Sequence, residues 1–151
     1  MDNTNESMLD VYLFETNDLL EHLDEILIEC EKNGSFDKDS INEIFRIMHT
    51  IKGSSAMMEF DTIARVSHKL EDLFYVIRDR GIDEGYFHEL FDLVLRVSDF
   101  LKDEVESIRL GQKPAIENEG LIAEIQTLLD KMNGNAANTG GGNSPGASNG
   151  N

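Results

Sequence analysis

Apolar side chains recur at helical spacing along most of the chain. Between residues 7 and 132 they return every three or four positions, the repeat of one face of an α-helix. No alternating apolar pattern of strand length competes with this repeat. The pattern therefore predicts an all-α protein with five helices, covering residues 7–30, 39–58, 61–80, 83–110 and 117–132.

Glycines and capping residues mark the predicted helix ends. Gly34, Gly81 and Gly111 follow the first, third and fourth apolar stripes, where a glycine commonly ends a helix. Asp39 or Ser40 is placed to cap the second helix. Short connections between helices of similar length favour antiparallel neighbours. We therefore expect an antiparallel four-helix bundle with a fifth, C-terminal helix.

The composition changes sharply after residue 132. Residues 133–151 are glycine, asparagine, alanine, serine and threonine with a single proline, and they carry no charge. Such a segment buries too little apolar area to offset the entropy of ordering it. The sequence thus predicts a domain at 1–132 and a flexible linker at 133–151, and a linker there suggests the N-terminal piece of a longer protein.

The charge balance limits the possible partners. The chain has 13 basic and 30 acidic residues, a net charge of −17, which would repel nucleic acids and anionic membrane surfaces. Residues 46–80 are the exception, with six basic and five acidic residues. Cys30 is the only cysteine, at an apolar position, so we expect a buried thiol and no intrachain disulfide. With no signal peptide or membrane-length apolar run, the sequence predicts a cytoplasmic protein.

The second predicted helix carries candidate chemistry at His49, Lys52 and Gly53. Residues at i, i+3 and i+4 share a helix face, so these three form one local surface. His49 lies opposite the apolar stripe formed by Ile44, Ile47 and Ile51. Gly53 costs a helix interior about 1 kcal/mol relative to alanine, which suggests that its missing side chain leaves room beside His49. A nucleophile, a cation and open space together favour phosphate chemistry at His49.

The third predicted helix carries His68 and Glu71, again at i and i+3. Both lie opposite the apolar stripe of their helix, so we expect both to face outward. A carboxylate that accepts a hydrogen bond from Nδ1–H of a histidine leaves Nε2 with a free lone pair. Glu71 is the candidate for this role on His49, and His68 either shares the network or is a plain surface residue.

His49-x-x-Lys52-Gly53, followed nineteen residues after the histidine by His68-x-x-Glu71, resembles the histidine phosphotransfer (HPt) domain of the chemotaxis kinase CheA. The resemblance covers about residues 8–132. It implies that His49 receives the γ-phosphoryl of ATP from the catalytic domain of the same kinase and passes it to an aspartate on response regulators of the CheY and CheB kinds. It also implies supporting roles for Lys52 and His68 and a hydrogen bond from His49 to Glu71.

One residue departs from the family pattern. The family often has a glycine just before the phenylalanine of the turn after the second helix, where this chain has Glu59 before Phe60. The geometry of that turn, and with it the contact with a regulator, is therefore an open question at the level of sequence.

The sequence contains no phosphate-binding loop of the G-x-x-x-x-G-K-[ST] type. Phosphoryl transfer needs positioned phosphates and a metal ion. We therefore expect a phosphocarrier with no cofactor of its own and no enzymatic activity alone, whose Mg-ATP is used by a kinase domain elsewhere.

Other interpretations of these motifs are also open. A stand-alone HPt relay between two receiver domains would use the same histidine, whereas a purely structural bundle would use none. A metal-binding bundle would draw on His68-x-x-Glu71 and on His22-x-x-Glu25, both reversed relative to the Glu-x-x-His motif of di-iron bundles. Phe45 lies one turn before His49, and Tyr75 lies one turn after Glu71. These two aromatic residues either dock a partner or pack between helices.

Overall fold

The computed structural model describes residues 3–112 and 119–141, and all regular structure in these ranges is helical. The helices are α1 (Asn3–Asn33), α2 (Lys38–Met57), α3 (Asp61–Arg80), α4 (Phe87–Arg109) and α5 (Glu119–Gly141), with a short 3₁₀ turn, η1 (Glu84–Tyr86), before α4. The all-α prediction is confirmed.

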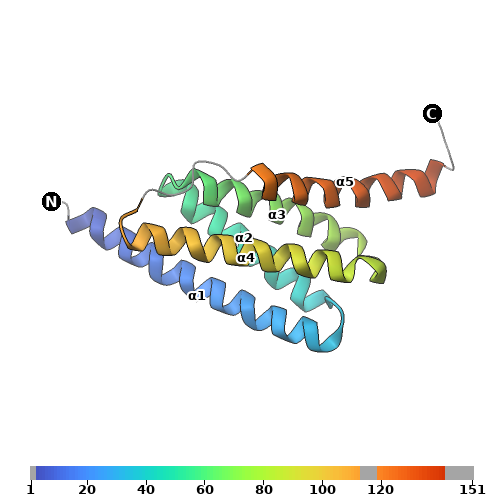
Figure 1. Cartoon of the computed structure of the whole chain (residues 1–151), viewed down its shortest axis with the longest axis horizontal. Helices are drawn as coiled ribbons and strands as arrows, with labels where there is room; N and C mark the ends of the chain where they lie inside the picture. The colour runs from blue at the N-terminus through green and yellow to red at the C-terminus, as the bar shows by residue number, and fades with distance from the viewer. Residues whose placement is uncertain (1–2, 113–118, 142–151) are drawn as a thin grey trace.

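The first four helices close into a bundle, and α5 lies outside it. Each of these helices contacts the next, and α1 also contacts α4, which completes the ring. The helix α5 runs along α3 and also contacts α4 (Figure 1). The helix that carries Glu71 is therefore packed against α2, α4 and α5, which covers it on more than one side.

Apolar side chains from all five helices form one core. It contains the predicted inward stripes of α2 and α3, and Cys30 is fully buried within it as a free thiol, as predicted. The helix α5 contributes Leu121, Ile125 and Leu128. At one end, the hydroxyl groups of Tyr12 and Ser55 lie 2.8 Å apart in a buried hydrogen bond, which ties α1 to the last turn of α2.

Several predicted helix ends differ from the structure, since α1 extends beyond 7–30 at both ends and α4 begins at Phe87 rather than at residue 83. The N-cap of α2 is Asp37, whose side chain accepts a hydrogen bond from the backbone N–H of Ser40 at 2.8 Å, so the prediction of Asp39 or Ser40 as the cap was wrong. The helix α2 therefore begins at Lys38, closer to the end of α1 than the sequence pattern indicated. The helix α5 continues to Gly141 rather than ending at Met132, and residues 142–151 of the predicted linker lie outside the described residues.

The turn after α2 forms with Glu59 in the left-handed region, at φ 65°. The backbone N–H of Glu59 donates to the carbonyl of Ala56 at 3.0 Å, and that of Phe60 donates to the carbonyl of Ser55 at 2.8 Å. This pair of hydrogen bonds is the Schellman arrangement that ends many helices, and its left-handed position favours glycine. Glu59 therefore adopts the left-handed backbone that this motif usually assigns to glycine.

Candidate functional site

His49 lies on the outward face of α2. Its side chain is 63% exposed, whereas the apolar residues around it on the helix are buried. The buried set consists of Ile44, Ile47, Met48 and Ile51. The amphipathic pattern therefore places the imidazole at the surface, as predicted, and fixes the helix beneath it.

Glu71 approaches His49 from the adjacent helix, α3. Its Oε2 lies 2.6 Å from Nδ1 of His49, and its Oε1 lies 2.8 Å from Nζ of Lys52. One carboxylate thus bridges the imidazole and the ammonium group of α2.

The prediction that Glu71 faces outward was wrong. Its side chain is only 10% exposed, beneath His49 and Lys52. The helical wheel describes one helix alone, whereas α3 contacts α2 on one side and α5 on another. The position opposite the main apolar stripe is therefore covered, and the buried carboxylate is compensated by two polar partners from α2.

The electrostatics keep Glu71 ionised. Burial raises the pKa of Glu71, but the hydrogen bonds and charges of Lys52 and His49 outweigh it, and the net pKa is lowered from its usual value of 4.5. An ionised carboxylate accepts hydrogen bonds and donates none, so the hydrogen bond to Glu71 assigns the proton of a neutral imidazole to Nδ1 of His49. The lone pair is then on Nε2, the nitrogen away from the carboxylate.

Three of the five predicted site residues, His49, Lys52 and Glu71, contact one another in the structure. The position of a fourth, Gly53, faces open space. Lys52 joins His49 and Glu71 through its ion pair, and a Cβ built on Gly53 meets no atom within 4 Å. His68 lies apart: its Nε2 is 3.6 Å from Oδ1 of Asp72, one turn along α3. A supporting role for His68 in phosphotransfer stays a prediction.

The two predicted aromatic residues form a cluster beside the imidazole. The ring of Phe45 stacks on that of His49 with centroids 6.3 Å apart, and the ring of Tyr75 lies 6.4 Å from that of Phe45. The guanidinium carbon of Arg78 is 4.1 Å from the centroid of Phe45. Phe45 also packs against the core, whereas Tyr75 is exposed, so packing and docking are both open to this cluster.

The Hpt domain family matches residues 7–111, more than half of the chain. This chain belongs to the Hpt domain family. Its similar relatives include the chemotaxis protein CheA of Borreliella burgdorferi, 30% identical over 145 residues that are 90% of this chain and 16% of the relative. The sensor histidine kinase CheAY of Helicobacter pylori is 37% identical over 132 residues, 87% of this chain and 16% of the relative. The chemotaxis protein CheA of Treponema pallidum is 30% identical over 131 residues, which are 85% of this chain and 16% of the relative. The Hpt chain spans about a sixth of the length of these relatives.

The contacts of this Hpt domain that involve Arg78 were not found from the sequence. The sequence shows Arg78 only as a cation in the last turn of its helix, where it balances the helix dipole. Its position three residues after Tyr75 was the available signal, because residues at i and i+3 share a helix face. The position of Phe45 opposite it depends on how α2 and α3 pack, which the sequence of one helix does not contain.

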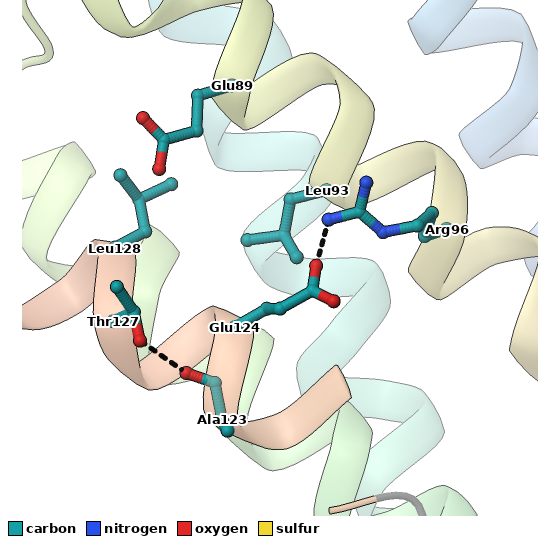
Figure 2. Close-up of a pocket in the computed structure, with 7 residues that line it drawn as sticks. All are labelled: Glu89, Leu93, Arg96, Ala123, Glu124, Thr127 and Leu128. Carbon is teal, nitrogen blue, oxygen red and sulfur yellow. Dashed lines mark hydrogen bonds and ion pairs between the residues drawn. The ribbon is translucent and has the colours of Figure 1, made fainter. Parts of the chain in front are cut away.

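The Hpt domain also has a cleft whose lining does not include His49. This cleft of about 220 Å³ between α4 and α5 has Leu93 and Leu128 in its lining, and an ion pair joins Arg96 to Glu124 across it (Figure 2). The hydroxyl of Thr127 donates to the carbonyl of Ala123 at 2.9 Å within α5. The polar groups at this cleft thus bind one another, which makes it a seam that attaches α5 to the bundle.

The residues proposed for a metal site do not converge. Within the ranges 3–112 and 119–141, no group of three or more histidine, cysteine or acidic side chains is arranged to hold a metal ion. His22 instead lies 3.2 Å from Glu43 and 3.6 Å from Glu25, at the surface. The metal-binding alternative is not favoured by these contacts.

The described helices include none that is long and apolar enough to cross a membrane.

Proposed function

We propose that this domain is the phosphoacceptor of a CheA-like histidine kinase, and that Nε2 of His49 is the atom that receives the phosphoryl group. The observation that supports the proposal is the 2.6 Å contact between Nδ1 of His49 and Oε2 of Glu71. That contact directs the lone pair of an exposed imidazole toward solvent, where a phosphoryl donor has access.

In the proposed loading step, Nε2 attacks the γ-phosphorus of ATP held by a kinase domain. An N–P bond forms, the bond from the γ-phosphorus to the bridging oxygen breaks, and its electron pair leaves with ADP. The imidazole becomes a cation that keeps its proton on Nδ1. Glu71 stabilises this positive charge through a hydrogen bond that is already in place, so that little reorganisation is needed.

In the proposed unloading step, a carboxylate oxygen of an aspartate on a response regulator attacks the same phosphorus. The N–P bond breaks and its electron pair returns to Nε2, which restores the neutral imidazole and its hydrogen bond to Glu71. We propose regulators of the CheY or CheB type as acceptors, because the similar relatives are named chemotaxis proteins and a CheAY histidine kinase. The cytoplasm is the proposed setting.

Within this proposal the domain is a carrier and the kinase domain is the catalyst. Lys52 keeps Glu71 ionised and adds positive charge near the incoming phosphoryl group. Mg-ATP is bound by the kinase domain, since the sequence of this chain has no phosphate-binding loop. A stand-alone relay would use the same atoms with an aspartyl phosphate as donor, and the relatives favour the kinase.

The test is to mix the chain with a CheA-type kinase core and radiolabelled Mg-ATP, beside His49→Gln and His68→Gln. We expect label that is labile in acid and stable in alkali on the wild type and on His68→Gln, and none on His49→Gln. Label on all three proteins, or on none of them, would contradict the proposal. Labelling by a phosphorylated receiver domain but never by the kinase would favour the relay.

A further inference from the structure

A basic groove begins one helical turn from His49. It lies between the first half of α2 and the last turn of α3 and has a volume of about 730 Å³. Four cationic side chains line it, together with one carboxylate, that of Asp79; the cations are Lys38, Arg46, Arg78 and Arg80. In a chain with a net charge of −17, this groove is a local excess of positive charge.

The cations of the groove differ from most others in their partners. Within the part of the chain that the structure describes, none of the four forms an ion pair: Arg78 lies over the ring of Phe45, and Arg80 donates to Oδ1 of Asn133 at 3.4 Å. Elsewhere, most described cations pair with a carboxylate, among them Lys52, Arg65, Arg96, Lys102, Arg109 and Lys131. The groove therefore leaves its positive charge available to another molecule.

The groove is continuous with the phosphoacceptor site. The guanidinium carbon of Arg78 is 4.1 Å from the centroid of Phe45, and the same ring stacks on the imidazole of His49. Arg46 is one turn before His49 on α2, and Lys38 is about 16 Å before it at 1.5 Å per residue. A partner that reaches His49 and also covers the groove would bury a strip of α2 and α3 of about this length.

We propose that this groove docks the acidic surface of the response regulator that flanks its acceptor aspartate. The inference rests on the proposed function. An aspartate that takes a phosphoryl group works with Mg²⁺, which proteins bind through further carboxylates, so the surface around it is acidic. A kinase domain instead surrounds the phosphates of ATP with Mg²⁺ and its own cations. The unpaired cations therefore complement the regulator better than the kinase.

The experiment separates loading from unloading. The wild type, the variant Arg46→Gln/Arg80→Gln and the control Arg96→Gln/Lys131→Gln are phosphorylated by a kinase core, freed of ATP and mixed with a CheY-type regulator in stopped flow. We expect the groove variant to transfer about tenfold more slowly at low salt, because removing charges at the edge of an interface lowers the association rate. The control should transfer as the wild type does, and only the wild type and control should slow steeply with added salt.

The single variant Lys38→Gln, at an exposed position of the groove, should also slow transfer to the regulator. Circular dichroism checks that each variant is folded. Unchanged transfer by a folded and phosphorylated groove variant would overturn the inference. Slower loading by the kinase with normal transfer to the regulator would also overturn it and assign the groove to the kinase. A wild type that never acquires a phosphoryl group would be a different result, because it would end the proposed function itself.

Discussion

At the scale of single residues, Glu71 determines which nitrogen of His49 carries the lone pair. Its carboxylate binds Nδ1 of His49 and Nζ of Lys52 from the neighbouring helix. Its burial removes it from competing water, so its charge acts strongly on the imidazole. Helical spacing found the residue and its partner, whereas its burial depends on the packing of α2 against α3.

Glu71→Gln is expected to slow phosphorylation of His49 roughly 10- to 100-fold. The amide keeps the size of the side chain and an acceptor oxygen, but it has no negative charge to stabilise the imidazolium that forms. The rate of labelling by a kinase core under single-turnover conditions measures this effect. His22→Gln is the matched control on another surface histidine, and an equal loss there would contradict the role of Glu71.

Glu71 also predicts a dependence of stability on pH. Because its pKa is lowered in the folded protein, the stability it adds is present above its unfolded pKa and is lost as the pH falls through the folded pKa. Urea unfolding should therefore show the wild type to be more stable than Glu71→Gln at about pH 7, with the difference shrinking at about pH 3. A difference that grows as the pH falls would contradict the ionised assignment.

Gly53 predicts opposite effects on stability and on function. A Cβ at this position meets no atom within 4 Å, so Gly53→Ala should raise the free energy of unfolding by up to about 1 kcal/mol through helix propensity. The same methyl group occupies space beside His49, and phosphotransfer should slow. Gly134→Ala in α5, where a Cβ also meets nothing, is the matched control. If Gly53→Ala left phosphotransfer unchanged, the open space would have no functional role.

At the scale of elements, the end of α2 holds backbone strain. Glu59 adopts a φ of 65° to complete the hydrogen bonds that end the helix. A residue other than glycine in the left-handed conformation destabilises the folded state by about 1–2 kcal/mol. Replacement by glycine removes this strain, but it also raises the entropy of the unfolded chain, which offsets part of the gain.

Glu59→Gly should therefore raise the free energy of unfolding by about 0.5–1 kcal/mol, measured by urea denaturation. Glu59→Ala keeps the strain and should leave the stability close to that of the wild type. A loss of stability in Glu59→Gly would show that the side chain of Glu59 makes a contribution larger than the strain.

Helix positions were predictable because each helix has a strong apolar repeat, but several ends were not. The cap at Asp37 lies before the position that the pattern indicated, and α5 continues into residues whose composition predicted a linker. The aromatic cluster of Phe45 and Tyr75 was found by helical spacing, and the cation over Phe45 was not. For the cation the missing information is the relative position of α2 and α3, which a single-helix pattern does not carry. The Asp37 cap is instead a local hydrogen bond to the backbone N–H of Ser40, and the apolar pattern does not report it.

At the scale of the whole molecule, α5 supports the helix that carries Glu71. It lies outside the residues matched by the family and packs on α3 (Figure 1). Its Ile125 is fully buried. Ile125→Ala should lower the free energy of unfolding by about 2–5 kcal/mol in one cooperative transition. Thermal or urea unfolding with the exposed control Thr127→Ala checks this. Unchanged stability would mean that α5 is not part of the folded unit.

The central claim is that the phosphoryl group binds to Nε2 of His49, since Glu71 occupies Nδ1. The most direct test is long-range ¹H–¹⁵N NMR of the phosphorylated chain labelled with ¹⁵N-histidine. We predict coupling to phosphorus at Nε2 of His49 and a proton retained on Nδ1. Phosphorus on Nδ1 of His49, or on any other histidine, would contradict the account.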